Sequence, residues 1–481
     1  MVALFIWSFI VSRNLFVLLI ALLIGNVASY AGSSGNYVTQ GSAVRLAEAV
    51  RIKTISHQDR SQINYDEFRR FHLFLRSSFP RVFSQLEIEA VNEHSLLFHW
   101  RGQNADLKPV LLTAHMDVVP VEPGTEQDWE HPAFDGVIAD EKIYGRGTLD
   151  DKQGLMGILE AAESLLAEGF VPDRSLVFAF GHDEEISGGQ GAVKLAQRMR
   201  ELNWHFEWMV DEGGMVLADT PLLPGKTMAL INVAEKGYLT LTLVATGEGG
   251  HSSRPPKIST IGRLSRALNI IEENPFEPRL VGPVEAMFEA MAPHVEQPQR
   301  FIFNNLWLTE FLVTGQMSED ATTNSFVRTT TALTMINAGI KENVIPQRAE
   351  AKVNFRLLPG DTPELVRAHI EALVNDPEIE FLVDNWNNIP GISDHEAIGF
   401  KVLAEAAASV YSDIVVVPSL LTATTDTRHY IDLADNQYRF HGVSMSDTQA
   451  TSIHGTNEYV SVLSYENSIA IARQIIQLGA R

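Results

Sequence analysis

The sequence predicts an α/β protein: a large domain with a central mixed β-sheet flanked by helices, and a smaller α+β domain of ferredoxin-like type inserted into it. First, helical patterns alternate with short apolar runs from about residue 39 to residue 230, which is typical of an α/β sheet. Second, the pattern changes after Lys236-Gly237, where residues 238–246 alternate like a half-exposed antiparallel strand. Third, the 481 residues suffice for two or three domains.

Three apolar runs in the first half of the chain predict buried strands, at residues 110–114, 176–180 and 208–210. Residues 154–167 predict a helix, because their apolar side chains recur on one face. Each apolar run ends at or just before a cluster of His, Asp or Glu. Ligands of open α/β sheets bind beyond the carboxyl ends of the strands, so these clusters indicate a site there.

The inserted domain is predicted from the order of its elements. These are a strand at 238–246, a helix at 259–273, a long aromatic-bearing insertion at 275–324, a strand at 349–358, a helix at 362–375 and a strand at 378–383. This βα…βαβ order predicts an inserted domain over residues 236–386, which leaves 32–235 and 387–481 to the large domain; the chain closes with a helix at 465–478. The apolar insertion has two interpretations, a satellite core or an acyl-binding surface.

Composition excludes several function classes. The formal net charge is -23, from 60 acidic and 37 basic residues, which argues against a nucleic-acid or anionic-membrane partner. The chain contains no cysteine, so disulfides and thiolate metal sites are excluded. Any metal ion must therefore be held by histidine and carboxylate side chains.

The N-terminus predicts export. Residues 3–28 are mostly apolar, and the run 15–24 follows the positive Arg13 and precedes small residues at 29–31, as in a signal peptide. The stretch is also about long enough for an uncleaved membrane anchor. We expect a periplasmic or secreted protein, or one anchored by residues 1–31.

Acidic and histidine residues at strand ends or in glycine-flanked turns form one constellation. Its members are His115, Asp117, Asp150, the pair Glu184-Glu185, Asp211 and His454. Any one alone is most simply a capping or solvated residue, but strand-terminal positions of an α/β sheet converge on one crevice. Oxygen and imidazole ligands suit zinc, and two ions that share a carboxylate make a hydrolytic site. Adjacent glutamates can divide metal binding from proton transfer.

Four further stretches of the sequence are distinctive. They are 129–132 (Trp-Glu-His-Pro), 328–332 (Arg-Thr-Thr-Thr-Ala), 425–430 (Thr-Asp-Thr-Arg-His-Tyr) and 453–458 (Ile-His-Gly-Thr-Asn-Glu). With the constellation above, they resemble the zinc metallopeptidase family of aminoacylase, succinyl-diaminopimelate desuccinylase and Gly-Xaa carboxypeptidase. The likeness covers residues 40–480 and is greatest to the branch of carboxypeptidase S and N-fatty-acyl-amino-acid synthase/hydrolase. It implies a catalytic domain with an inserted lid domain.

The resemblance implies two zinc ions per chain. Asp150 should bridge them, with His115 and Asp211 completing the coordination of one ion. Glu185 and His454 should complete that of the other ion. The family also has a cis peptide after the bridging residue, here between Asp150 and Asp151.

The resemblance also implies the catalytic and substrate-binding residues. Glu184 should be the general base, and Asp117 should orient the imidazole of His115. On the lid, His251 should stabilise the oxyanion, often from a partner subunit, which makes a homodimer through the lid possible. Arg356 and Asn343 should grip the substrate carboxylate.

The function that these residues imply is hydrolysis of the amide bond that precedes a C-terminal amino acid with a free carboxylate. A zinc-bound hydroxide would attack the carbonyl, with Glu184 shuttling the proton. One alternative is an N-acyl-amino-acid amidase rather than a dipeptide carboxypeptidase. Others are an exopeptidase that recognises a free amine, for which no dedicated acidic pair is found, and a non-catalytic binding protein on this scaffold. Thr424 departs from the Gly or Asn of many relatives, which weakens any transfer of their specificity.

Overall fold

The computed structural model describes residues 41–218, 220, 223–387 and 390–481. The predicted signal peptide or membrane anchor at residues 1–31 lies outside these ranges. In the described ranges, no helix combines the length and the apolar character needed to cross a membrane.

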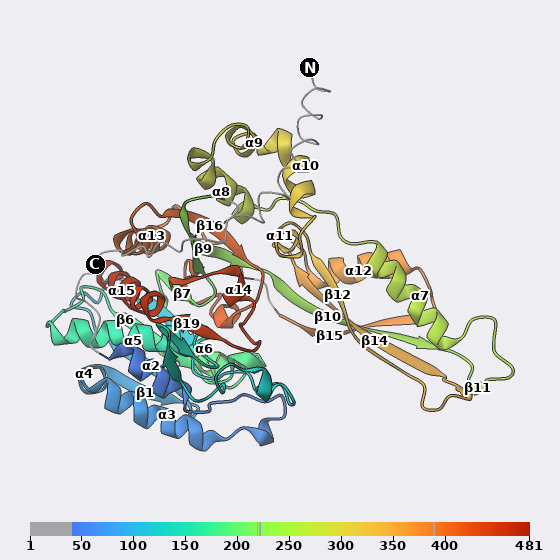
Figure 1. The fold of residues 1–481 in the computed structure, drawn as a ribbon, viewed down its shortest axis with the longest axis horizontal. Coiled ribbons are helices and arrows are strands. Elements are labelled where there is room, and N and C mark those ends of the chain that lie inside the picture. The colour runs from blue at the N-terminus through green and yellow to red at the C-terminus, as the bar shows by residue number, and fades with distance from the viewer. Residues whose placement is uncertain (1–40, 219, 221–222, 388–389) are drawn as a thin grey trace. The chain divides into compact units, whose positions relative to one another are not determined.

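The larger sheet has ten strands and is mixed, as the sequence predicts (Figure 1). Its order is β1-β2-β6-β3-β7-β17-β9-β8-β18, with β16 pairing β9 outside this path. β3 is parallel to β6 and β7, whereas β2 is antiparallel to β6, and β8 to β9. The strands are β1 Glu87–Val91, β2 Ser95–Trp100, β3 Val110–His115, β6 Leu176–Gly181, β7 Trp208–Asp211, β8 Met215–Ala218, β9 Thr227–Glu235, β16 Val415–Leu421, β17 Gln437–Arg439 and β18 Val443–Met445.

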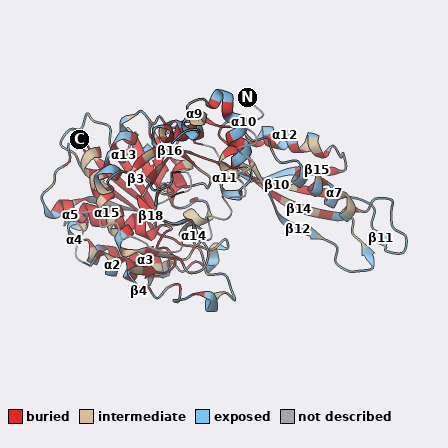
Figure 2. Cartoon of the chain, turned by 45° about the horizontal axis from the view of Figure 1, so that its top comes forward, coloured by how far each residue is buried: buried red, intermediate tan, exposed pale blue. Residues whose placement is uncertain are grey.

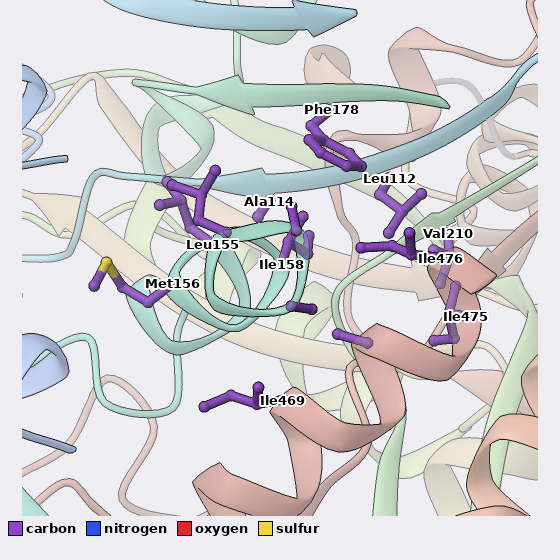
Figure 3. Packing of buried hydrophobic residues seen from close by; sticks show 14 of the residues in the cluster. Leu112, Ala114, Leu155, Met156, Ile158, Phe178, Val210, Ile469, Ile475 and Ile476 are labelled. Atoms are coloured by element: carbon purple, nitrogen blue, oxygen red, sulfur yellow. The ribbon is translucent and has the colours of Figure 1, made fainter. Parts of the chain in front are cut away.

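Helices cover both faces of this sheet because successive side chains of a strand point in opposite directions. Leu112 of β3 belongs to the core with α5 and α15 (Figure 3), whereas Leu111 belongs to a second core with α6. The helices of this body are α2 Ser42–Val50, α3 Tyr65–Ser78, α4 Pro80–Gln85, α5 Lys152–Ala167, α6 Ala192–Glu201, α13 Ile398–Val410, α14 Asp447–Ala450 and α15 Val462–Gly479, with 3-10 turns at Arg60–Gln62, Glu126–Asp128, Glu184–Ile186 and Asp426–His429.

The start of α5 is fixed by close packing. A Cβ on Gly154 would lie 2.2 Å from Nδ1 of His441, so the helix reaches this histidine only because residue 154 is glycine. His441 Nδ1 lies 3.0 Å from Oδ1 of Asp151, the residue before the helix. The Asp150–Asp151 peptide is cis, which confirms the prediction.

The segment predicted as an inserted domain contains a separate antiparallel sheet in the order β12-β14-β10-β15. Helices α7 and α12 pack on one face of it. Edge strand β12 is largely exposed, as is the small two-stranded sheet of β11 and β13 (Figure 2). The elements are β10 Gly237–Thr246, β11 Gly250–His251, α7 Thr260–Glu273, β12 Thr330–Ala338, β13 Val344–Ile345, β14 Arg348–Leu357, α12 Pro363–Val374 and β15 Ile379–Trp386.

The aromatic insertion is helical, and its inner side packs against the large sheet. Met287 and Phe288 share a buried cluster with Val415 and Val417 of β16, which supports the satellite-core interpretation for that side. On the outer side Trp307 and Phe311 are exposed. The helices are α8 Gly282–Met291, α9 Gln299–Phe303, α10 Leu306–Met317 and α11 Ala321–Val327, with a 3-10 turn at Ala292–His294.

A third sheet of three short strands joins distant parts of the chain, in the order β19-β5-β4. It pairs Tyr459 with Tyr144 and so brings the C-terminal region beside the segment that leads to Asp150. The strands are β4 Val137–Ala139, β5 Lys142–Tyr144 and β19 Tyr459–Ser461.

Candidate metal centre

Neighbouring parallel strands bring the predicted acidic and histidine residues together. His115 is the last residue of β3, and Asp211 is the last residue of β7. The pair Glu184-Glu185 lies in the 3-10 turn that follows β6. Because β6, β3 and β7 are adjacent and parallel, their carboxyl ends meet at one edge of the sheet, as the sequence predicts.

Asp150 lies between two histidines and offers one carboxylate oxygen to each. Its Oδ1 is 2.9 Å from Nε2 of His115, and its Oδ2 is 3.0 Å from Nε2 of His454. The same nitrogen of His454 lies 3.2 Å from Oε2 of Glu185. This is the arrangement expected of a carboxylate that bridges two metal ions, each with its own imidazole.

The tautomer of His115 suits a metal ligand. Its Nδ1 faces the backbone carbonyl oxygen of Asp117 at 3.0 Å, so that nitrogen carries the proton and donates it. Nε2 points at carboxylates and is the nitrogen through which His115 would bind a cation in exchange for a proton. Burial by itself would lower the pKa of His115, but Glu212, Asp117 and Asp150 outweigh it and raise the pKa well above its usual value.

Buried carboxylates exceed the cations around them, which fits a metal site. Oε1 of Glu185 is buried and has no hydrogen-bond partner among the described residues. Burial, reinforced by Asp150, raises the pKa of Glu185 to about 7 and that of Glu212 well above its usual range. A bound divalent cation would relieve this repulsion, and the histidine and carboxylate donors suit zinc. Two donor sets have ligand atoms within 4.8 Å of one another: His115, Asp150 and Glu185, and His115, Asp151 and Glu212.

Asp211 ends β7 and Glu212 follows it, and their two carboxylates differ in their contacts. Oδ2 of Asp211 accepts a hydrogen bond of 2.8 Å from Oγ1 of Thr427, and Oδ1 accepts one of 3.0 Å from the backbone N–H of Glu212. Oε1 of Glu212 instead lies 3.4 Å from Nε2 of His115. Asp211 stays a predicted ligand: its carboxylate accepts two hydrogen bonds, whereas that of Glu212 lies beside His115. The acidic dipeptide at this strand end was the available signal.

Asp117 connects the first histidine to the glutamate pair. It is fully buried, and its Oδ1 lies 3.5 Å from Nδ1 of His115. Its carboxylate accepts hydrogen bonds from Oγ of Ser56 at 2.5 Å and from the backbone N–H groups of Glu184 at 3.1 Å and Glu185 at 3.2 Å. Burial opposes ionisation, but the contact with His115 outweighs it and lowers the pKa of Asp117. Asp117 therefore holds an imidazole and the acidic turn in a fixed relation.

Glu184 lies beside a guanidinium that the sequence did not single out. Nη1 of Arg428 is 3.5 Å from Oε1 of Glu184, and the same nitrogen donates a 2.5 Å hydrogen bond to the carbonyl oxygen of Thr425. Burial, and then the nearby Asp426, raise the pKa of Glu184 well above its usual value, while Arg428 opposes the rise. A carboxyl group with a raised pKa can both accept and return a proton near neutral pH. Arg428 belongs to the motif 425–430, which was the missed signal.

Arg356 is a partly buried cation that has no paired anion in the described part of the chain. It lies on β14 with its guanidinium 4.9 Å from the ring centre of Tyr238. Within the ranges that the structure describes, it forms no ion pair with a carboxylate closer than 4 Å. Burial lowers the pKa of Arg356, and Arg428 lowers it further, whereas Tyr238 and Glu184 oppose the change. It remains available to an anionic substrate group.

His251 and Asn343 lie together at the exposed two-stranded sheet of β11 and β13. The backbone N–H of Ser252 donates a 3.1 Å hydrogen bond to the carbonyl oxygen of Asn343. Nδ1 of His251 lies 2.8 Å from Oγ of Ser253. No hydrogen bond or ion pair joins His251 to the histidine and carboxylate cluster in the described part of this chain. These two predicted residues are thus brought to each other and not to the metal centre.

The fold and the site define a metallohydrolase, and comparison with known proteins agrees. A family model described as "Peptidase family M20/M25/M40" matches residues 111–478, and the chain belongs to this family. It is a zinc-dependent hydrolase of the metallopeptidase and amidohydrolase type.

Two curated relatives match nearly the whole chain. "Probable carboxypeptidase S-like 2" of Dictyostelium discoideum is 38% identical over 442 residues, which cover 90% of this chain and 84% of the relative. "N-fatty-acyl-amino acid synthase/hydrolase PM20D1" of Bos taurus is 39% identical over 441 residues, covering 90% and 87%. The resemblance to this branch is confirmed.

Solved structures confirm the fold. The M20 family metallo-carboxypeptidase Sso-CP2 from Sulfolobus solfataricus aligns with a TM-score of 0.66 at 18% identity, covering 92% of this chain and all 100% of that one. Human carnosine dipeptidase 1 aligns with a TM-score of 0.64 at 15% identity, covering 91% of this chain and 96% of that one.

Proposed function

We propose that the chain is a di-zinc hydrolase that cleaves the amide bond before an amino acid with a free carboxylate. The observation that carries this proposal is the position of Asp150, whose two oxygens face His115 and His454 at 2.9 and 3.0 Å. His115, Asp150 and Glu212 would hold one ion, and Asp150, Glu185 and His454 the other. When bound, the ions would polarise the amide carbonyl and acidify a water molecule.

The side chains divide the remaining work. Glu184 takes a proton from the attacking water and returns it to the leaving amine, which its raised pKa suits. Asp117 keeps His115 in the tautomer that leaves Nε2 free. Arg356 binds the carboxylate of the leaving amino acid, because it is a partly buried cation that forms no ion pair with any other described residue.

Carboxylate recognition is tested with an N-acyl amino acid and its C-terminal amide. A buried guanidinium left without a partner costs about 1–3 kcal/mol, so kcat/KM for the amide should fall by about ten- to a hundredfold. Arg356→Met should remove most of that difference, whereas Arg367→Met, on the outer face of α12, should leave it unchanged. Equal turnover of acid and amide by the unaltered enzyme would remove the carboxylate clamp from the mechanism.

The second candidate is an N-acyl-amino-acid amidase, which the match to the synthase/hydrolase relative favours. The two candidates differ in the group on the acyl side, a fatty acyl chain or an aminoacyl residue. A kinetic series of dipeptides and of acyl amino acids of increasing chain length separates them. A rise of kcat/KM with acyl length would favour the amidase, and a flat response would favour the dipeptide carboxypeptidase.

We also propose a homodimer through the inserted sheet. Edge strand β12 exposes Met335 and Ile336, at 63% and 62%, and an exposed apolar edge strand can pair with another chain. A partner could then supply His251 and Asn343, which this chain does not bring to its own centre. Mixing His251→Ala with Glu184→Gln should restore up to about a quarter of the wild-type turnover if the histidine acts in trans. No recovery in proven mixed dimers would place the histidine in cis.

Export is proposed from residues 1–31 alone. N-terminal sequencing of the protein recovered from its producing cells, with fractionation, separates cleavage from membrane anchoring. Recovery of an intact N-terminus in the soluble intracellular fraction would contradict both.

A further inference from the structure

Two loops that carry metal-ligand candidates meet although they lie some 300 positions apart in sequence. One is the Asp150 loop, residues 145–150, which follows β5. The other is the His454 loop, residues 451–458, which precedes β19. Pairing of Tyr144 with Tyr459 places the base of one loop beside the base of the other.

A buried ion pair joins the two loops. Nη1 of Arg146 lies 2.5 Å from Oε2 of Glu458, and their side chains are only 2% and 0% exposed. Oε1 of Glu458 accepts hydrogen bonds from the backbone N–H groups of Gly147 at 3.0 Å and Leu149 at 2.9 Å. In the other direction, Nη2 of Arg146 donates a 2.8 Å hydrogen bond to the carbonyl oxygen of Gly455. Glu458 therefore binds the backbone of the Asp150 loop at Leu149, one residue from Asp150. Arg146 binds the backbone of the His454 loop at Gly455, one residue from His454.

Asn457 attaches the His454 loop at another point. Its Oδ1 accepts a 2.6 Å hydrogen bond from the backbone N–H of Glu130, and its Nδ2 donates one of 3.2 Å to the carbonyl oxygen of Asp128. The backbone of Asn457 is left-handed, with φ of 59°, a conformation that asparagine tolerates better than most residues.

His454 depends on such anchors far more than His115 does. It belongs to no helix or strand, its side chain is 52% exposed, and its φ of 62° is unfavourable for a residue with a Cβ. His115 ends a buried strand, and its side chain is 2% exposed. Sheet pairing and packing fix His115, whereas the cross-loop contacts hold His454.

We propose that Arg146, Asn457 and Glu458 are positioning residues that clamp the His454 loop to the Asp150 loop and set the affinity of the second metal ion. The inference rests on the proposed two-ion centre. None of the three touches the reacting atoms. They act through the distance between Asp150 and His454, so their loss should loosen the ion between these residues and spare the one at His115 and Glu212.

The test is a titration of metal-free protein with Zn²⁺ in competition with a chromophoric chelator. Glu458→Gln keeps the shape of the side chain but removes its charge, and Asn457→Gly keeps the left-handed backbone but removes the carboxamide. Each substitution should weaken the affinity for the second equivalent of Zn²⁺ by about ten- to a hundredfold and leave the affinity for the first equivalent unchanged. At one equivalent of Co²⁺, the absorption spectrum of Glu458→Gln should match that of His454→Ala.

Glu163→Gln is the matched control. Glu163 is also a buried carboxylate that accepts hydrogen bonds from two backbone N–H groups, of Arg81 and Val82, and from the Arg81 side chain. Glu163→Gln should lower the midpoint of thermal unfolding, as Glu458→Gln does, and leave the affinities for both metal ions unchanged.

Three outcomes would overturn the clamp: unchanged affinities in both loop variants, equal weakening of both ions, or the same selective loss in Glu163→Gln. If Glu458→Gln does not fold, the Zn²⁺ titration of Asn457→Gly is by itself the test of the clamp. Wild-type protein that binds a single ion would instead contradict the proposed two-ion function itself.

Discussion

Replacing Glu212 and Asp211 in turn tests which carboxylate of the β7 end reaches the metal centre. Glu212 Oε1 lies 3.4 Å from Nε2 of His115, whereas Asp211 accepts hydrogen bonds from Thr427 and from its own neighbour's backbone. Residues that only orient a ligand typically contribute ten- to a hundredfold to metal affinity. Loss of a direct ligand should reduce metal affinity by more than this. Glu212→Gln should therefore weaken binding of the first ion by more than about a hundredfold, which corresponds to about 2.7 kcal/mol.

Asp211→Asn should behave differently. The amide oxygen can still accept the hydrogen bond from Thr427, and the cost should appear as about 1–3 kcal/mol of stability, the range for a perturbed buried hydrogen bond. Metal content after gel filtration, measured by mass spectrometry, and thermal unfolding of the metal-free proteins separate the two effects. A metal-depleted Asp211→Asn beside a metal-replete Glu212→Gln would refute the reasoning and restore Asp211 as the ligand.

Two further predictions concern Glu184, the proposed general base, and Lys236, a buried lysine. Glu184→Gln should retain its metal but lose about two to four orders of magnitude in kcat, whereas Glu185→Gln should lose metal; the reverse pattern would exchange their roles. Burial lowers the pKa of Lys236 from 10.5 to about 7, so between these pH values this lysine binds more protons in the unfolded than in the folded state. The contribution of Lys236 to the free energy of unfolding should therefore rise between pH 7 and about 10, by up to about 1.4 kcal/mol per pH unit. Denaturant titrations should show it as a difference in unfolding free energy between wild type and Lys236→Met that grows with pH, and a difference independent of pH would exclude it.

The fold and much of the centre could be predicted because they depend on local patterns. The runs that became β3, β6 and β7 are continuous apolar segments of strand length, and each ends at a polar cluster. Parallel neighbours then force those ends together. Periodicity predicted both α5 and α15, whose apolar side chains pack in the core beside the sheet.

What could not be predicted depends on side-chain direction and on long-range packing. Asp211 and Glu212 are adjacent carboxylates, and the sequence alone does not show that Asp211 accepts a hydrogen bond from Thr427 while Glu212 lies beside His115. Arg146 and Glu458 are 312 positions apart, and nothing in either motif alone pairs them. The aromatic insertion lies within residues 236–386, and the sequence alone does not show that Phe288 packs with β16 of the large sheet; an apolar helix is buried wherever the chain offers a complementary surface.

Metal content and activity measured on the same sample test the central claim most directly. Purified protein should contain two zinc ions per chain, lose them together with amide hydrolysis on chelation, and regain both with Zn²⁺ or Co²⁺. A fully active preparation without a stoichiometric transition metal would contradict the account.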